Sequence, residues 1–213
     1  VGIVDAAHAG RAVEDIVQGA VYTPPIYPTL QAFVAANPAG ADFCILGIAT
    51  PGGALPRELR DQAREAIRLG MSVVNGLHDH LHDDPTLVEA AREAGVTLVD
   101  VRRPKPFPEL RFWSGDIFAV KCPRIAVLGT DCAVGKRTTS VLLQEALQAT
   151  GIRVAMVYTG QTGWMQGHPH GVILDALPND FVSGELEGAV VACWRDLRPD
   201  VILIEGQSAL RNP

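Results

Sequence analysis

The segment 124–139 constrains the fold of this chain more than any other part of the sequence. It opens with the apolar run Ile125–Leu128, continues through a loop bounded by Gly129 and Gly135, and passes through Lys136 into a helical pattern. Glycines let backbone N–H groups converge on a phosphate without Cβ clashes, and a helix N-terminus with a lysine adds positive charge. The pattern therefore predicts a buried strand, a phosphate-binding P-loop and a helix, as found in a parallel α/β sheet.

The loop departs from the usual P-loop pattern in two ways. Five residues rather than four separate Gly129 from Gly135, as in the P-loop of dethiobiotin synthetase, and Arg137 stands where a serine or threonine would hold Mg²⁺. Either Thr138 or Thr139 reaches the metal after a one-residue shift, or the loop holds a pyrophosphate without Mg²⁺, so the magnesium requirement is open. The predicted cofactor-binding residues are Gly129, Thr130, Asp131, Cys132, Gly135, Lys136, Arg137, Thr138 and Thr139. We interpret Cys132 as a small residue that fills the loop rather than as a nucleophile.

Two further clusters follow predicted strands of the second half. Ligands of open α/β sheets bind at the carboxyl ends of the strands, where Thr159–Gly163 and Glu205–Gln207 are expected. Glu205 would be a Walker-B-like acid or a general base there, although a plain turn is the alternative for both clusters. Asp180 could bind a metal or the substrate amine, or could cap a helix that begins at residue 183. The predicted catalytic residues are Glu205, Lys136 and Asp180, and the predicted substrate-binding residues are Gly160, Gln161, Thr162, Gln207 and His78.

His78 belongs to a stretch with histidines at alternating positions, which also includes His80 and His82. In a strand these side chains would share one face, as in a metal site. Because the stretch follows a predicted strand and precedes Pro85, we expect a loop and no metal site. His78, nearest to the strand end, is the one expected to face a ligand.

Strand and helix patterns alternate along the whole chain. In the first half we expect strands at 1–5 and 43–49, both buried on two faces, further strands at 71–75 and 96–100, and helices at 56–69 and 85–94. In the second half we expect strands at 124–128, 153–158 and 201–204 and helices at 136–150 and 183–197. Three prolines in 102–108 interrupt this alternation.

The alternation predicts an α/β protein with two domains. A Rossmann-like N-terminal domain would cover 1–105, a linker 106–123, and a P-loop NTPase-like parallel-sheet domain 124–213. A three-stranded sheet is thin for such a fold, since open sheets usually have about four to six strands. We therefore expect residues beyond one or both ends to complete the sheet of the P-loop domain.

The composition indicates which kinds of partner the chain can bind. Hydrophobic residues make up 47% and charged residues 20%, as in a globular protein, and no run approaches the roughly 18 apolar residues of a membrane span. The net charge is −6, and the basic residues form no run that would neutralise nucleic-acid phosphates. The four cysteines lack metal-binding spacing, as in a reduced cytoplasmic protein. We expect a cytoplasmic homo-oligomer that binds a small-molecule substrate, with no nucleic-acid or membrane partner.

Seven ordered blocks resemble the DgcN family of bacterial and archaeal proteins, which was first catalogued as a domain of unknown function. The matching blocks are Gly47–Gly53, Gly76–His78, Val99–Arg103, Gly129–Thr139, Thr159–Gly163, Asp180–Gly184 and Ile204–Ser208. The resemblance implies a Rossmann-like N-terminal domain, a P-loop C-terminal domain, and further residues at both ends. It also implies N-acetylation of D-glutamate, or of a similar amino acid, from acetyl-CoA.

Three functions are therefore expected as alternatives. In acyl transfer, the P-loop would bind the pyrophosphate of coenzyme A. Glu205 or an aspartate would take a proton from the substrate amine, and N–H groups of 160–163 would stabilise the oxyanion of the tetrahedral intermediate. An ATP-dependent kinase or ligase of the dethiobiotin-synthetase type would instead hold ATP or ADP with Mg²⁺. The third alternative is a non-catalytic nucleotide-binding protein.

Overall fold

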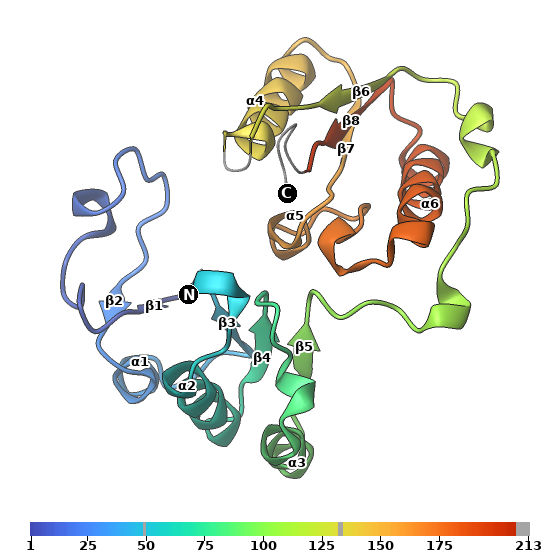
Figure 1. Cartoon of the computed structure of the whole chain (residues 1–213). Coiled ribbons are helices and arrows are strands. Elements are labelled where there is room, and N and C mark those ends of the chain that lie inside the picture. The colour runs from blue at the N-terminus through green and yellow to red at the C-terminus, as the bar shows by residue number, and fades with distance from the viewer. Residues whose placement is uncertain (49, 132–133, 208–213) are drawn as a thin grey trace. The chain divides into compact units, whose positions relative to one another are not determined.

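The computed structural model describes residues 1–48, 50–131 and 134–207 of the chain. The chain divides into two compact units, Val1–Asp100 and Val101–Pro213. Each unit contains a parallel three-stranded sheet with helices packed on it, so the predicted α/β class is confirmed (Figure 1). No helix within the described residues combines the length and the apolar character needed to cross a membrane.

The sheet of the first unit has the order β3-β4-β5. Its parallel strands are β3 (Phe43–Leu46), β4 (Ser72–Asn75) and β5 (Leu98–Asp100), joined by the helices α2 (Arg57–Arg68) and α3 (Pro85–Ala94). The register places the last residues of the strands side by side, with Asn75 opposite both Leu46 and Asp100. The loops that follow β3, β4 and β5 therefore leave the sheet at one edge.

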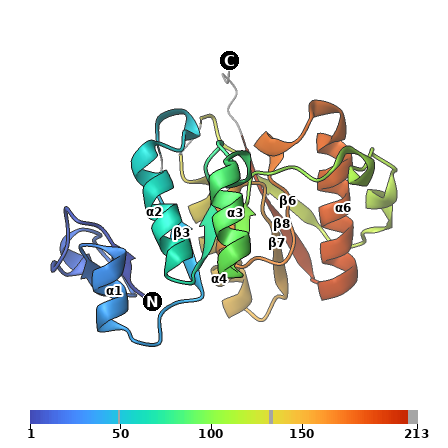
Figure 2. The same cartoon turned by 90° about the horizontal axis from the view of Figure 1, so that it is seen from below.

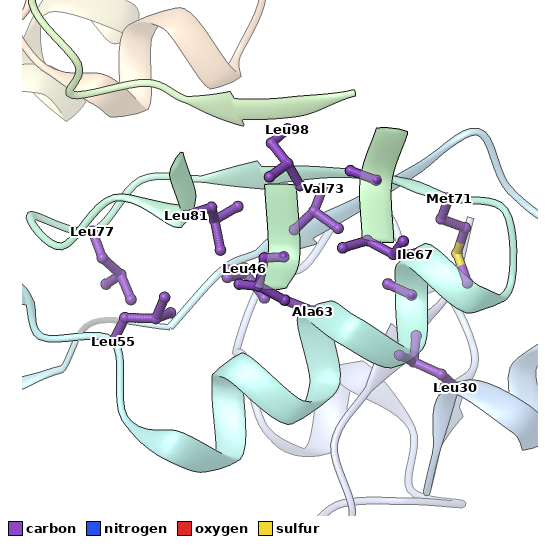
Figure 3. Packing of buried hydrophobic residues seen from close by; sticks show 13 residues of the cluster. Leu30, Leu46, Leu55, Ala63, Ile67, Met71, Val73, Leu77, Leu81 and Leu98 are labelled. Carbon is purple, nitrogen blue, oxygen red and sulfur yellow. The ribbon is translucent and has the colours of Figure 1, made fainter. Parts of the chain in front are cut away.

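Helix α2 supplies much of the core of this unit. Its pattern predicts an apolar face, and Ala63 and Ile67 on that face are buried against Leu46 and Val73 of the strands (Figure 3). Helix α3 has the predicted bounds because Asp84 caps its first turn at the Thr86 amide and Gly95 ends it with a φ of 68°.

The N-terminal segment differs from its prediction. Val1–Asp5 was expected to be a buried strand, but only β1 (Ile3–Val4) is extended, and it pairs with β2 (Ile26–Tyr27) in a separate two-stranded sheet. Its side chains are exposed, as are Phe43 and Ile45 of the edge strand β3. The prediction of burial on both faces is therefore wrong for β1 and β3. Helix α1 (Leu30–Ala36) was not predicted, and Ala49 lies outside the described residues.

The sheet of the second unit has the order β6-β8-β7. Its parallel strands are β6 (Arg124–Val127), β7 (Val154–Val157) and β8 (Val201–Glu205). Alternate residues of β7 and β8 face α4 (Lys136–Ala149) and α6 (Asn179–Leu197), which cover opposite faces of the sheet (Figures 1 and 2). The predicted strands and helices of this half are confirmed in position, although α6 begins four residues earlier than expected. The burial predicted for the strand before the P-loop is wrong, because β6 lies at the edge of the sheet and its Ile125 is exposed.

The proline-containing segment 102–123 lies within the second unit and packs on α6. Two buried glutamates of α6 hold it: Glu185 accepts hydrogen bonds from Lys105 and the Arg111 amide, and Glu187 accepts them from the amides of 114, 115 and 117. Gly184 of α6 touches the segment directly, because a Cβ there would overlap the backbone of Arg111 and Phe112. These contacts fix the chain just before it enters β6.

Candidate functional site

The carboxyl ends of three strands meet at one edge of the second unit's sheet. Glu205, the last residue of β8, lies opposite Val127, the last residue of β6, while Ile204 lies opposite Val157 at the end of β7. The P-loop, the segment 159–163 and the segment 205–207 therefore all leave the sheet at this edge. Parallel α/β sheets bind their ligands at such edges.

Glycine is required at both ends of the P-loop. Gly135, which precedes α4, has a φ of 89°, a backbone conformation that favours glycine. At Gly129 a Cβ would lie only 2.8 Å from Cγ2 of Val134 and 3.0 Å from Cγ of Lys136. The loop thus folds back closely on the start of the helix, and Cys132 within it lies outside the described residues.

Lys136 is the first residue of α4, and its side chain crosses the loop. Its Nζ donates a hydrogen bond to the Asp131 carbonyl oxygen at 2.7 Å, so the ammonium lies against the loop backbone. Four other predicted ligand residues, Thr130, Asp131, Thr138 and Thr139, are exposed. A helix N-terminus, a lysine and exposed hydroxyl groups at one loop form a suitable environment for a phosphate group.

Arg137 contacts two other elements of the edge. Its Nη1 donates to Oε2 of Glu205 at 2.9 Å, and its Nε donates to Oε1 of Gln166 at 2.7 Å, with Nη2 on the same amide oxygen. The side chains of Arg137 and Glu205 are only 15% and 8% exposed, so this ion pair is largely shielded from solvent. Arg137 therefore joins α4 to the end of β8 and to the segment that follows β7.

Glu205 is also held by the chain that follows β7. The Thr159 amide donates to Oε2 of Glu205 at 3.3 Å, and the Thr159 hydroxyl donates to the Glu205 carbonyl oxygen at 2.8 Å. The same carboxylate oxygen thus receives N–H groups from Arg137 and Thr159.

The predicted glycine-rich loop is mostly a short helix, α5 (Gln161–Met165). Gly160 precedes it, and a Cβ there would lie 2.6 Å from Nε2 of Gln207, so these two predicted substrate residues are neighbours. Gln161 is half-buried and Thr162 is exposed. The Gly163 amide donates to the Gly160 carbonyl oxygen at 3.1 Å, which occupies one of the N–H groups expected to stabilise an oxyanion.

Sequence reasoning missed two residues beside Arg137. Gln166 accepts a hydrogen bond from the guanidinium. His168 lies close enough for the charge of Arg137 to shift the pKa of its imidazole. Burial lowers the pKa of His168, the positive charge of Arg137 lowers it further, and Glu205 acts in the opposite direction. The net effect favours the neutral imidazole. Both residues follow α5, and neither the P-loop pattern nor the strand-end patterns assigned them a role at this edge.

Arg137 and Glu205 connect α4, β8 and the segment that follows β7. Two predicted site residues, Asp180 and His78, belong to other elements. Asp180 is the second residue of α6 and is exposed, and the helix cap predicted for it is wrong because Pro178 occupies that position. His78 belongs to the first unit, where a Cβ on Gly53 would overlap its imidazole ring.

Another histidine of the predicted loop makes the more specific contact. The stretch from 77 to 83 is a bend followed by a 3₁₀ helix, as expected for a loop, and Nδ1 of His82 lies 2.6 Å from the buried carboxylate of Asp100. Asp100 also accepts hydrogen bonds from Asn75 and from the Leu81 amide. Burial raises the pKa of Asp100, but these hydrogen bonds outweigh it and hold the pKa below its ordinary value.

Comparison with known proteins gives concordant matches for both units. Residues 6–104 match the family model of a domain of unknown function described as the DUF1611_N Rossmann-like domain, and residues 111–213 match that of the DUF1611_C P-loop domain. The solved structure of a DUF1611 family protein from Anabaena variabilis ATCC 29413 superposes on the whole chain with a TM-score of 0.86 at 34% identity, and 59% of that protein is covered.

Two curated relatives carry a functional name. Proteins named D-glutamate N-acetyltransferase from a Pseudoalteromonas species and from Tritonibacter scottomollicae are each 35% identical to this chain over 82% of its length. The matched region is 50% of each relative, so the chain spans about half the length of these proteins.

Proposed function

Because the chain belongs to the DUF1611 family, we propose that it is part of an N-acetyltransferase that moves the acetyl group of acetyl-CoA to the amine of D-glutamate or a similar amino acid. The observation that carries the proposal is the 35% identity to two proteins named D-glutamate N-acetyltransferase over 82% of this chain. The P-loop supports it, because coenzyme A contains a pyrophosphate that has to be bound but not cleaved.

The pyrophosphate would bind at the start of α4. The N–H groups at a helix N-terminus point toward the space in front of the helix, and Lys136 adds a full positive charge beside those of α4. Thr138 and Thr139 are exposed in that turn and offer hydroxyl groups to phosphate oxygens. These are the residues we assign to the coenzyme.

The reaction forms one bond and breaks another. The amine nitrogen attacks the thioester carbon, the N–C bond forms, the C–S bond breaks, and the coenzyme leaves as a thiolate that takes up a proton. The substrate ammonium loses two protons in total, of which one is balanced by the thiol and one is released. A group that accepts a proton from the amine is therefore required.

Glu205 and Asp180 were predicted for the proton transfer, but the contacts of Glu205 suggest another role. Its carboxylate holds Arg137 in place, and we propose that this is its main contribution. Glu205→Gln separates the two roles. A fall in turnover with unchanged coenzyme affinity would indicate a proton acceptor, whereas a large loss of coenzyme affinity would indicate a residue that positions Arg137.

The proposal is tested by calorimetry followed by an assay of thiol release. We expect acetyl-CoA to bind, and D-glutamate to release coenzyme A thiol faster than L-glutamate, its mirror-image control. Binding of ATP that depends on Mg²⁺, with no affinity for acetyl-CoA, would instead favour the kinase or ligase. Nucleotide binding without turnover of any amine would favour the non-catalytic alternative.

A further inference from the structure

P-loop proteins hold Mg²⁺ with a hydroxyl group that follows the P-loop lysine and with an acid at the end of a neighbouring strand. In this chain the first position is Arg137, whose guanidinium has five N–H donors and no acceptor, so it cannot coordinate a cation. The second position is Glu205, and its Oε2 receives Nη1 of Arg137 at 2.9 Å. The two groups that would hold the metal are thus bound to each other, and these residues do not fit Mg²⁺.

A hydroxyl group further along α4 does not restore the usual arrangement. The helix is regular from its first residue, since the Thr139 amide donates to the Gly135 carbonyl oxygen at 2.8 Å. Each residue turns the helix by about 100°, so Thr138 leaves α4 in a different direction from Arg137. The side chain that α4 directs at Glu205 is that of Arg137.

The guanidinium is fixed at this edge by several contacts. Gln166 accepts from Nε and Nη2, and Glu205 accepts from Nη1. Gly163 makes room for it, because a Cβ at that position would lie 3.0 Å from Nη1. An arginine keeps its charge at all physiological pH values, so a guanidinium remains at this edge whatever the pH, with Glu205 as its counter-ion.

We propose that Arg137 is a built-in cation that replaces Mg²⁺, so that the site binds a diphosphate-bearing ligand without a divalent metal ion. The identification of that ligand as coenzyme A rests on the proposed function. Lys136, Arg137 and the N-terminus of α4 together supply positive charge for the diphosphate. Phosphoanhydride cleavage in P-loop enzymes relies on a metal ion that bridges the phosphates, so this site holds its ligand intact.

The wild-type chain provides the first test, with acetyl-CoA and ADP as calorimetric probes in EDTA and in Mg²⁺. We expect the affinity to be the same under both conditions. Binding of either probe that requires Mg²⁺ overturns the role of Arg137. Metal-independent binding of ADP without any binding of acetyl-CoA supports that role while overturning the coenzyme assignment, so the two proposals fail separately.

Arg137→Ser restores the residue type of the usual motif and supplies the second test. In EDTA we expect it to weaken binding of the probe by about 10- to 150-fold, the effect of losing one charge-assisted contact. Mg²⁺ should then recover part of the affinity through the serine and the released Glu205. The double variant with Glu205→Gln lacks the carboxylate and should not recover. Unchanged affinity of Arg137→Ser in EDTA contradicts the proposal.

Arg153→Ser is the matched control. Arg153 also pairs with a carboxylate, that of Asp200, but it does so at the amino ends of β7 and β8, at the opposite edge of the same sheet. This variant loses an arginine of the same unit without touching the phosphate site. Its affinity in EDTA should equal that of the wild type.

Arg137→Ser leaves the buried Glu205 without its arginine and therefore risks a folding defect. Gln166→Leu tests the same proposal without removing the ion pair. Gln166 is exposed and follows α5, so the ion pair and the fold should persist when it is replaced. Loss of its hydrogen bond should loosen the guanidinium and weaken metal-free binding by roughly 2- to 12-fold. Full wild-type affinity of this variant in EDTA speaks against a fixed guanidinium.

Discussion

At the scale of single residues, Lys136 and Arg137 are adjacent cations with different partners. Lys136 reaches back to a carbonyl oxygen of its own loop, whereas Arg137 is tied to side chains that follow two other strands. A hydrogen bond to a loop carbonyl can be exchanged for one to a phosphate oxygen at little cost. We therefore expect Lys136 to move onto the ligand when it binds, and Arg137 to meet the ligand in the position that its partners already fix.

Lys136→Ala should weaken binding of acetyl-CoA by roughly 10- to 150-fold, since one charge-assisted contact contributes about 1.5–3 kcal/mol. Lys121→Ala is the control, because Lys121 is an exposed lysine of the same unit that lies before β6. Calorimetry of both variants measures the difference. Equal affinities of the two variants would show that the P-loop lysine does not touch the ligand.

Asp100 makes the first unit sensitive to acid. Its folded pKa lies below the ordinary 3.8, because the hydrogen bonds from Asn75, His82 and Leu81 favour the carboxylate more than burial disfavours it. A depressed folded pKa means that the unfolded chain binds the proton more tightly. The stabilisation is thus complete above about pH 3.8 and is lost as the pH falls from there through the folded pKa.

Asp100→Asn should lower the stability of the first unit at pH 7 by about 1.5–3 kcal/mol, the contribution of a charged hydrogen-bond acceptor. It should also flatten the loss of stability below pH 3.8, because no carboxylate remains to be protonated. Urea denaturation at several pH values measures both effects. Asp83→Asn, with a side chain 77% exposed, is the control and should change neither. An acid sensitivity equal to that of the wild type in Asp100→Asn would rule out this account.

At the scale of elements, α6 uses glycine to bring the segment 102–123 into contact with its surface. Gly184 and Gly188 are four residues apart and therefore share one face of the helix. Both face Arg111, but Gly184 touches backbone atoms, while the nearest atom to Gly188 is Nη1 of the flexible Arg111 side chain. The same substitution should thus have opposite effects at the two positions.

Gly184→Ala should destabilise the second unit by about 1–3 kcal/mol, because the added methyl group overlaps the backbone of Arg111 and Phe112. Gly188→Ala should stabilise it by about 0.5–1 kcal/mol, since alanine is the better helix former and the arginine side chain can move. Chemical denaturation of both variants compares the two shifts. Equal shifts would mean that the segment does not pack on α6 as described.

Regular patterns predicted most of the elements, and tertiary contacts explain the rest. Helix α3 has an apolar face, a capping aspartate and a terminal glycine, and the sequence alone located its bounds. Helix α5 contains Gly163 and follows Gly160, so local propensity favours a turn there, and the helix forms where close packing on Tyr158 and Arg137 requires the absence of a Cβ. Such a contact is invisible in a single sequence.

The sequence also predicted part of the candidate site. The P-loop and the position of Glu205 follow from the strand-to-loop spacing, because parallel strands bring their carboxyl ends together. The partner of Arg137 does not follow from spacing, since 68 residues separate it from Glu205 and Gln166 belongs to no motif. The unusual residue was visible in the sequence, but the ion pair that gives it a role was not.

At the scale of the whole molecule, the described core residues fall into separate clusters. One cluster contains only residues of the first unit, including Leu87 of α3, and two clusters contain only residues of the second, including Leu203 of β8. The hydrophobic contribution to stability is therefore divided between the units. Each unit is expected to open as its own cooperative element in hydrogen exchange.

Leu87→Ala and Leu203→Ala test this division with the same chemical change in each core. Both leucines have 0% exposure, so each truncation should cost about 2–5 kcal/mol of local stability. Leu87→Ala should speed hydrogen exchange of the β4 amides and leave those of β7 unchanged, and Leu203→Ala should do the reverse. If either variant accelerates exchange in both sheets equally, the chain unfolds as one cooperative body, and a ligand bound at the P-loop edge would then stabilise the first unit as much as the second.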